Sequence, residues 1–490
     1  MILFTFEDLI GRSSFAALYL SNCHFSTGNR RHRHAYELQM DAVDPTPHLE
    51  RFKDYEQACR EFRWLIPQCL NIASAVCRRH RDAVTRTALS EVKVGGINTY
   101  TFGGLDFLSD KFATALFQSD ITPGDRVAVM LAPSAALAVA QLGALKTGAV
   151  VVALSKVTDV AFLEHALADS SAKAVVVDES SYGAVEKAAR NLRQLESRFV
   201  VRELGPNGIR STDYKDFWGV INKASSDFAV VETLASAPAF IFYIESQGNC
   251  PGIIHSHRSI IGQLAAFEMF NNVKSDSVFW TSGDWSTPAT ILGVLYPAWW
   301  YGCSLAGTSE QPTGVPRLLE RCEVTHAFLP ARHLTKLELD RKPGEFSKLR
   351  TIVVEAQSSQ HDYQNYNPGL ILNEVHGKPE TGWIFGRCER WFAVPDDSVG
   401  RRVPGRSIEI IDETGTVIQS RHRGYIAIHK SDPALFTGYY HSDARTAAAF
   451  IGDWFLTGDL GYKSDDGQLY IAPTSGEPEM DQAPKNDNGC

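Results

Sequence analysis

A glycine-containing segment follows a predicted buried strand at 239–243. Residues 243–252 read YIESQGNCPG, and they include no lysine, while Glu245 adds a negative charge. Open α/β sheets bind ligands at turns that follow their strands, and glycines there let backbone N–H groups approach phosphate oxygens. A phosphate-binding turn and a plain strand–turn connection are both compatible with the segment. Taken alone, its composition favours the plain connection.

Two histidines lie two residues apart in the next segment, IIHSHRS at 253–259. On a strand, His255 and His257 would share one face, as two ligands of a metal ion can. A zinc site needs at least a third protein ligand, and none is visible nearby in the sequence. We therefore interpret both as structural histidines.

Two later segments contain acidic residues in settings where a nucleotide could bind. Residues 373–383 read NEVHGKPETGW and follow a predicted strand at 370–372. A carboxylate in such a loop can hold Mg²⁺ that bridges nucleotide phosphates, although a solvent-facing acid is equally compatible. Residues 453–461 read DWFLTGDLG. Here Asp459 after Thr-Gly can accept hydrogen bonds from a ribose hydroxyl pair, or it can be an ordinary turn carboxylate.

Alternating strands and helices precede these segments. The apolar spacing predicts strands at 126–131, 149–154, 173–178, 239–243, 326–329, 351–354 and 370–372, and helices at 134–147, 160–169 and 183–198. Strand–helix–strand units of this kind form a mostly parallel sheet that helices cover on both faces. After Gly400, short predicted strands at 407–412 and 425–429 indicate a smaller β-rich subdomain.

The composition excludes several classes of protein. The chain has 490 residues, 44% of them hydrophobic and 21% charged, and a net charge of −9 that argues against nucleic acid as a partner. The basic cluster at 30–34 is interpreted as a solvated N-terminal segment. Nine scattered cysteines predict reduced thiols and a cytoplasmic protein. We expect no membrane span, because no apolar run reaches the roughly 18–20 residues that a membrane helix needs.

The order of these segments resembles the adenylate-forming (AMP-binding) superfamily, and most of all its short- and medium-chain acyl-CoA synthetases. The segments FWTSGDW at 279–285, VGRRVPG at 399–405 and FTGY at 436–439 are similar to further motifs of that family. The resemblance spans residues 62 to 471. It implies an α/β fold, the large N-terminal domain of adenylate-forming enzymes, in which helices flank parallel sheets and a small β-rich subdomain follows.

The resemblance and the composition together predict four regions. They are a poorly defined N-terminal extension at 1–60, α/β AMP-binding subdomains at 61–395, a β-rich subdomain at 396–471, and a polar, disordered tail at 472–490. In the family, the chain continues beyond the β-rich subdomain with a hinge and a small mobile domain that supplies a catalytic lysine and a CoA surface. Here Ala472 and Pro473 begin the polar tail instead, so we expect that domain to be missing.

The resemblance also implies a reaction and its ligands. In the family a small-molecule carboxylate reacts with ATP, in the presence of Mg²⁺, to give an acyl-adenylate and pyrophosphate, and the thiolate of CoA then displaces AMP. By matching position, the implied ATP- or AMP-binding residues are Ser246, Gly248, Gly252, Glu355, Ala356, His376, Gly377 and Asp459. Glu380 is the implied metal ligand, and His255 and Trp285 are the implied walls of an acyl pocket.

This sequence departs from the family pattern where the chemistry takes place. The family's loop ends in Pro-Lys-Gly, whereas Pro251 directly precedes Gly252 here. Val353 and Val354 replace paired glycines, so we expect their side chains to crowd a nucleotide, and Pro379 replaces a threonine. We therefore predict impaired catalysis. The alternatives are a non-catalytic pseudoenzyme that binds a nucleotide, an acyl ligand or a protein, and a decayed gene product. No pattern specifies the acyl substrate or an oligomeric state.

Overall fold

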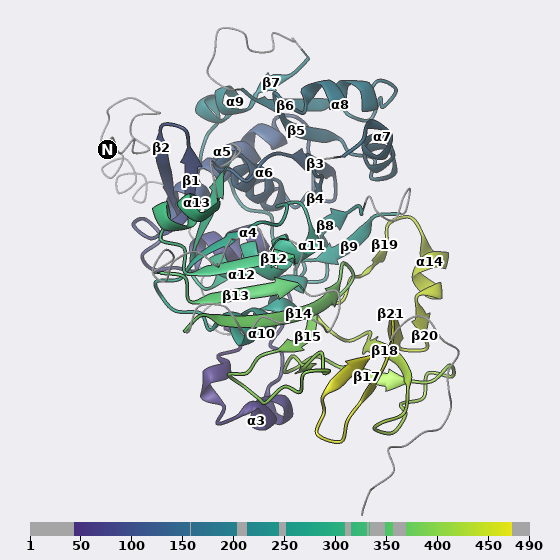
Figure 1. The fold of residues 1–490 in the computed structure, drawn as a ribbon. Helices are drawn as coiled ribbons and strands as arrows, with labels where there is room; N and C mark the ends of the chain where they lie inside the picture. The colour runs from purple at the N-terminus through teal and green to yellow at the C-terminus, as the bar shows by residue number, and fades with distance from the viewer. Residues whose placement is uncertain are drawn as a thin grey trace, which may run out of the picture.

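The computed structural model describes residues 44–156, 158–202, 213–244, 251–308, 315–330, 333, 348–355 and 369–472 (Figure 1). Within these residues, the strands form three sheets. Two large sheets lie in the α/β part of the chain, and a smaller one is formed by the C-terminal strands (Figure 1). The α/β class predicted from the alternating strands and helices is confirmed.

The first large sheet has eight strands and is mostly parallel. Its order is β19 (Gly438–Tyr439), β9 (Ile253–Ser256), β8 (Pro238–Phe242), β4 (Val150–Ala153), β3 (Arg126–Met130), β5 (Ala174–Asp178), β6 (Ser197–Val201) and β7 (Lys215–Asp216). Strands β9 and β19 are antiparallel to their neighbours. Strands β8 and β9 therefore run side by side in opposite directions at one side of this sheet.

The second large sheet has nine strands, and its centre is parallel. Its order is β16 (Arg401–Arg402), β15 (Gly382–Arg387), β14 (Ile371–Lys378), β13 (Thr351–Glu355), β12 (His326–Pro330), β10 (Val278–Thr281), β11 (Ser304–Thr308), β1 (Thr87–Lys93) and β2 (Gly96–Thr101). The β14–β15, β15–β16 and β1–β2 pairs are antiparallel.

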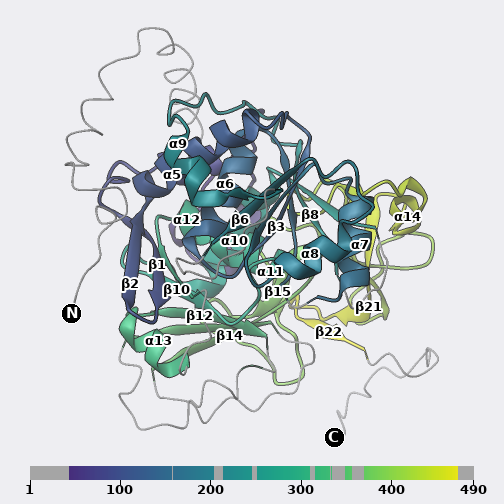
Figure 2. The ribbon, with the colours of Figure 1, turned by 90° about the horizontal axis from the view of Figure 1, so that it is seen from above.

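Helices cover both faces of both large sheets, as seen from above in Figure 2. Helices of the layer between the sheets are α4 (Ile72–Arg78), α5 (Phe102–Phe117), α6 (Ala135–Lys146), α10 (Ser259–Asn271) and α12 (Tyr296–Trp300). The outer faces carry α7 (Val160–Asp169) and α8 (Tyr182–Ala188) on one sheet and α13 (Val315–Arg321) on the other. Successive side chains of a strand point to opposite faces of the sheet, so they join different hydrophobic clusters. In β3, Val129 packs against the layer between the two sheets, and Met130 packs against the outer helices.

The remaining helices are short. They include α9 (Phe217–Lys223), α11 (Pro288–Thr290), the π-helical turn Ile291–Leu295 that joins α11 to α12, and α14 (Asp443–Ala448). Of the helices that the structure describes, none combines the length and apolar character needed to cross a bilayer.

The small sheet contains five strands: β17 (Ile408–Ile411), β18 (Gly424–His429), β21 (Trp454–Lys463), β20 (Phe450–Ile451) and β22 (Leu469–Ile471). All its pairings are antiparallel. Its strands agree with those predicted at 407–412 and 425–429.

Part of the predicted N-terminal extension lies within the described residues. It forms a 3₁₀ turn (Leu49–Arg51) and helix α3 (Tyr55–Glu61). The buried Tyr55 ring packs edge-on against Phe392, with 4.7 Å between ring centroids, and its hydroxyl donates to the Arg402 carbonyl (2.8 Å). The described end of this extension, from residue 44, therefore packs through Tyr55 on the segment around β16.

Two predicted elements differ from the structure. The helix expected at 183–198 ends at Ala188, because residues from Ser197 onward form β6 and pair with β5. Residues 373–383, expected as a loop, instead continue β14 to Lys378 and turn into β15. Both differences arise from pairing with a neighbouring strand, which the local sequence pattern does not reveal.

Candidate functional site

The tight turn between β14 and β15 is the centre of the candidate site. Thr381 closes it: its backbone N–H donates to the Lys378 carbonyl (3.0 Å), and its hydroxyl oxygen accepts from the Lys378 N–H (3.0 Å). Gly382 has a φ of 61°, a conformation that favours glycine. A Cβ on Gly377 would lie 2.0 Å from the Gly382 carbonyl oxygen. Gly377, one of the implied nucleotide-binding residues, is therefore required by the turn itself.

Two buried side chains, His255 and Gln263, make hydrogen bonds to the backbone of this turn. His255, which is fully buried, contacts the Pro379 carbonyl oxygen through Nε2 at 2.8 Å. Burial lowers the pKa of His255 to about 4, so the ring is neutral and donates from Nε2. Gln263 donates to the Thr381 carbonyl (3.0 Å) and accepts from the Trp383 N–H (3.1 Å). The predicted acyl-pocket role of His255 stays a prediction, while its observed contact positions the turn.

An ion pair that the sequence analysis missed also supports the turn. Arg406 and Asp432 are both 0% exposed, and the guanidinium Nε lies 2.7 Å from Asp432 Oδ2. Arg406 also donates to the carbonyls of Thr381 and Trp383, each at 3.0 Å. Both residues come from the segment that contains β17 and β18, so this pair connects the small sheet to the site.

Glu380 lies on the turn with its carboxylate nearly buried (7% exposed). The hydroxyl of Tyr439, in β19, donates to Glu380 Oε1 at 2.9 Å. Burial and the neighbouring carboxylate raise the pKa of Tyr439 above its ordinary value, so Tyr439 remains a donor. Its hydrogen bond fixes the orientation of the carboxylate.

Asp459 reaches the same turn from β21 of the small sheet. Lys378 Nζ lies 2.9 Å from Asp459 Oδ1. Gly458, with a φ of 84°, precedes it, and the Asp459 N–H donates to Thr457 Oγ1 at 3.2 Å. Glu380 and Asp459, which the resemblance assigns to the metal and the ribose, are thus both associated with this turn: Glu380 lies on it, and Asp459 pairs with Lys378 at its start.

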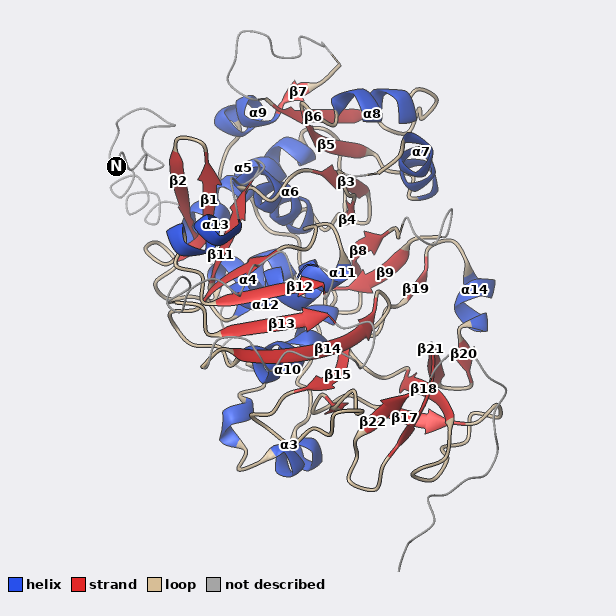
Figure 3. Cartoon of the chain, viewed as in Figure 1, coloured by secondary structure: helices blue, strands red, loops and turns tan. Residues whose placement is uncertain are grey.

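A cavity of about 340 Å³ opens beside this turn. Its lining includes Lys378, Glu380, Tyr439, Arg445, Thr457 and Gly458. Figure 3 shows the carboxyl ends of β13 and β14 on the side of the molecule that also carries β19, α14 and β21. Ligands of open α/β sheets bind at carboxyl ends of strands, so this cavity is the candidate site.

Strand β13, which pairs with β14, carries the segment that the family resemblance places beside adenine. Val353 and Val354 of β13 are both fully buried, each in a different hydrophobic cluster, and neither lines the 340 Å³ cavity. Glu355, at the end of β13, pairs with Val375 in register. The two valines therefore pack in the hydrophobic core, Val353 on one face of the sheet and Val354 on the other.

His376 lies beside this segment and is 6% exposed. Its ring stacks on Phe385, with 5.2 Å between centroids and 20° between planes. Burial lowers the pKa of His376 to about 4, so the ring is uncharged at neutral pH. A neutral planar ring is suited to packing against a base.

Of the other predicted site residues, Gly252 is described and does not line this cavity. Ser246, Gly248 and Ala356 lie outside the described residues. Gly252 begins the approach to β9, and its carbonyl accepts from the Tyr440 N–H (2.7 Å). A Cβ on Gly252 would lie 2.3 Å from Ile241 Cγ2, so a larger residue would not fit there.

Trp285 is buried between the two large sheets, with 1% of its surface exposed. A Cβ on Gly307 of β11 would lie 3.1 Å from Trp285 Cη2. The preceding residue, Asp284, accepts from the Ser155 hydroxyl at 2.5 Å, which links the carboxyl ends of β4 and β10. The segment predicted to line an acyl pocket thus lies where the two sheets meet.

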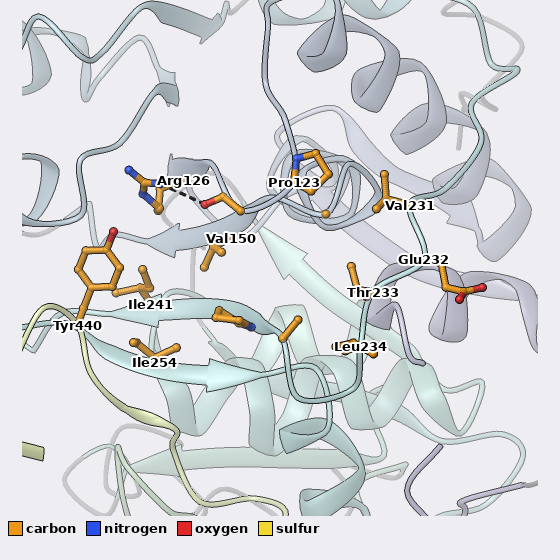
Figure 4. A pocket seen from close by; sticks show the side chains of 14 residues that line it. Pro123, Arg126, Val150, Val231, Glu232, Thr233, Leu234, Ile241, Ile254 and Tyr440 are labelled. Carbon is orange, nitrogen blue, oxygen red and sulfur yellow. Dashed lines mark hydrogen bonds between the residues drawn. The ribbon is translucent and has the colours of Figure 1, made fainter. Parts of the chain in front are cut away.

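A second cavity, of about 410 Å³, lies elsewhere (Figure 4). Its lining is mainly aliphatic and includes the first residues of β3, β4 and β8, namely Arg126, Val150 and Pro238. Arg126 directs its donors to backbone carbonyls, including that of Ser170 (2.6 Å). Because the Arg126 guanidinium is engaged by these carbonyls and the cavity lies at the amino ends of these strands, it is a weaker candidate.

Solved structures with the same fold are acyl-CoA synthetases and ligases. The crystal structure of a Brucella canis acyl-CoA synthetase superposes with a TM-score of 0.75 at 20% identity, covering 87% of this chain and 80% of that one. The ATP-bound MatB of Rhodopseudomonas palustris gives a TM-score of 0.70 at 21% identity, covering 82% and 78%. At these identities, the likeness establishes the fold alone.

Sequence comparison gives the family. The mitochondrial acyl-coenzyme A synthetase ACSM3 of Rattus norvegicus is 23% identical over 450 residues, which cover 87% of this chain and 76% of the relative. Its name places that relative in the mitochondrion, and the cytoplasmic location of this chain stays a prediction. Residues 75–440 match the family described as AMP-binding enzyme. Because this match covers well over half of the sequence, the chain belongs to the AMP-binding enzyme family, which includes adenylate-forming acyl-CoA synthetases.

Proposed function

We propose that this chain binds ATP with Mg²⁺ and a small-molecule carboxylate, and slowly transfers the AMP group of ATP to the carboxylate, which forms an acyl-adenylate and releases pyrophosphate. One observation carries the proposal: Glu380 lies on the β14–β15 turn beside a cavity, and Asp459 of the small sheet pairs with Lys378 at the start of that turn. The family generally uses ATP and Mg²⁺. The names of the relatives add support, since one solved neighbour is an anthranilate CoA ligase in complex with anthranoyl-AMP.

In this proposal, the ribose, the adenine base and the phosphates of the nucleotide each lie next to specific residues. Asp459 accepts hydrogen bonds from the ribose hydroxyls, and the neutral ring of His376 packs against adenine. Glu355 and Gly377 lie next to the base, and Trp285 forms a wall of the acyl pocket where the two large sheets meet. Ser246, Gly248 and Gly252 keep their predicted place beside the phosphates, and Ala356 its place beside adenine.

Glu380 fits the role of the protein's magnesium ligand. Mg²⁺ in nucleotide sites is usually held by one or two carboxylates together with substrate phosphates, rather than by an all-protein cage. In the described part of the chain, no three His, Cys, Asp or Glu residues gather as a metal site, and Glu380 lines the cavity as a single carboxylate. When bound, Mg²⁺ neutralises phosphate charge. The residues' own task is to orient the reactants.

The expected rate is low because residues 243–252 contain no lysine. Loss of one positioned donor in such a transition state costs ~10²–10³-fold in rate. The proposal covers only the formation of the acyl-adenylate, because the residues that support it are the ones assigned to the nucleotide and to the metal ion. Displacement of AMP by CoA is family chemistry that this argument does not include.

Pyrophosphate release with a panel of short, branched and aromatic carboxylates tests the proposal. We expect slow release that requires a carboxylate and falls by ~10²-fold or more in Glu380→Gln, because the amide removes the metal ligand's charge. Glu409→Gln is a matched control, since Glu409 pairs with Lys463 and does not line the cavity. Release that is independent of the carboxylate, or unchanged in Glu380→Gln, would count against the proposal.

A second candidate function is ligand binding without turnover, as in a pseudoenzyme. The observation that favours it is the ion pair between Lys378 and Asp459, which engages the carboxylate assigned to ribose. Saturable ATP binding without pyrophosphate release would support this candidate. A decayed gene product would instead unfold with poor cooperativity, which a thermal unfolding curve would reveal.

A further inference from the structure

The ion pair between Lys378 and Asp459 joins two sheets at the candidate site. Lys378 is the last residue of β14, and Asp459 lies in β21. Their side chains are 37% and 25% exposed, respectively, and the charged atoms are 2.9 Å apart. Partly exposed pairs contribute little net stability, because solvent screens their attraction. A ligand that offers Asp459 better hydrogen bonds can therefore separate the pair.

The walls of the 340 Å³ cavity have more positive than negative side chains. Lys378 and Arg445 both line it, and Glu380 is the acidic side chain in its lining. The Arg445 guanidinium carbon lies 4.7 Å from the centre of the Tyr439 ring, and Tyr439 in turn donates to Glu380. A cavity with two cations beside one metal-binding carboxylate is suited to an anion that also binds a divalent cation. A polyphosphate bound with Mg²⁺ has that chemistry.

We propose that Lys378 is the phosphate-binding cation of this nucleotide site. In the ligand-free state, its ammonium rests on Asp459. When the ribose hydroxyls occupy that carboxylate, Lys378 turns to the nucleotide phosphates, close to Glu380 on the same turn. A lysine ammonium on a flexible stem can make this change, and it binds phosphate as a point charge. Lys378 thereby supplies the charge that the lysine-free segment 243–252 lacks. This inference rests on the proposed function.

Calorimetric binding of ATP·Mg²⁺ and of adenosine to the full chain tests the inference. Adenosine has the base and the ribose but no phosphate. Removing a phosphate-binding residue should therefore lower the affinity for ATP and not the affinity for adenosine. We expect Lys378→Met to weaken ATP·Mg²⁺ binding by roughly tenfold or more, the effect of losing one charged hydrogen bond. Adenosine should bind the variant at least as tightly as the wild type, because Asp459 is then freely available.

Two further variants control for damage to the fold. Lys378→Arg keeps the charge and should retain most of the ATP affinity. Lys463→Met removes a comparable lysine, 32% exposed and 2.6 Å from Glu409 in the small sheet, and should change neither affinity. A wild-type-like melting temperature for Lys378→Met verifies that its fold is intact.

The outcomes separate this inference from the proposed function. If wild type binds both ligands and Lys378→Met weakens them equally, or leaves ATP affinity unchanged, the inference is wrong while the proposed nucleotide site stands. If wild type binds neither ligand, the proposed function is wrong, and the inference falls with it. Selective loss of ATP affinity, with adenosine retained, supports both.

Discussion

Four histidines among the described residues are buried and uncharged. His255, His257, His326 and His376 are at most 6% exposed, and burial lowers their pKa values to about 4, about 3, about 4 and about 4, respectively. Each is a neutral ring that packs or makes a hydrogen bond. The interpretation of His255 and His257 as structural histidines agrees with their contacts: His255 Nε2 contacts the Pro379 carbonyl, and His257 Nδ1 accepts from the Ile72 N–H.

These histidines make the fold sensitive to acid. A histidine with a pKa of about 4 in the folded state and about 6.5 when unfolded binds more protons in the unfolded chain between those values. Stability is therefore fully present above pH ~6.5 and is lost as the pH falls toward ~4. We expect His326→Gln, which keeps a donor for the Asn271 carbonyl but cannot titrate, to reduce this loss.

Urea unfolding at pH 7.5 and 5.5 measures the effect. Between these pH values the wild type should lose about 1 kcal/mol more free energy of unfolding than His326→Gln, the contribution of one such histidine. Equal losses in both proteins would show that His326 is not the neutral, buried group described above.

At the scale of elements, the β14–β15 turn depends on the pair formed by Arg406 and Asp432. The pair is fully buried, and Arg406 also donates to two carbonyls of the turn region. Removing one member of a buried pair leaves an uncompensated charge, which costs ~3–5 kcal/mol. The pair therefore connects the position of Glu380 to the packing of the small sheet.

A double-mutant cycle tests this connection. Asp432→Leu alone should lower the free energy of unfolding by ~3–5 kcal/mol, and adding Arg406→Met should cost less than Arg406→Met does in the wild type. Asp465→Leu is the exposed control: Asp465 pairs with Arg421 at 67% and 64% exposure, and we expect a loss below ~1 kcal/mol. Additive losses in the cycle would contradict a coupled, buried pair.

The sequence predicted elements with regular apolar spacing and missed contacts between distant residues. The strands and helices from 126 to 178 were predicted to within a few residues, because each is a buried run or an amphipathic repeat. Lys378 and Asp459, by contrast, lie 81 residues apart, and their pairing depends on how two sheets dock. Residues 373–378 were taken for a loop for the same reason, since pairing with β13 on one side and β15 on the other makes them a strand.

At the scale of the whole molecule, the candidate site exists because the small sheet docks beside the carboxyl ends of the nine-stranded sheet. β14 contributes Lys378 to the cavity lining, the β14–β15 turn contributes Glu380, β19 contributes Tyr439, and β21 contributes Thr457 and Gly458, which precede Asp459. Three sheets therefore take part in one cavity. Measuring nucleotide binding at this site therefore also tests whether the three sheets are arranged as described.

Calorimetric titration of the full chain with ATP·Mg²⁺, repeated with Asp459→Ala and Asp453→Ala, tests this arrangement most directly. Asp453 is the matched control, an exposed aspartate immediately before the same strand, where it pairs with Lys430. We predict saturable binding to the wild type and to Asp453→Ala, and binding at least ~10-fold weaker in Asp459→Ala, because the ribose hydroxyls lose their charged acceptor. No binding to the wild type at about millimolar ATP, or equal binding to all three proteins, would contradict a nucleotide site at this turn.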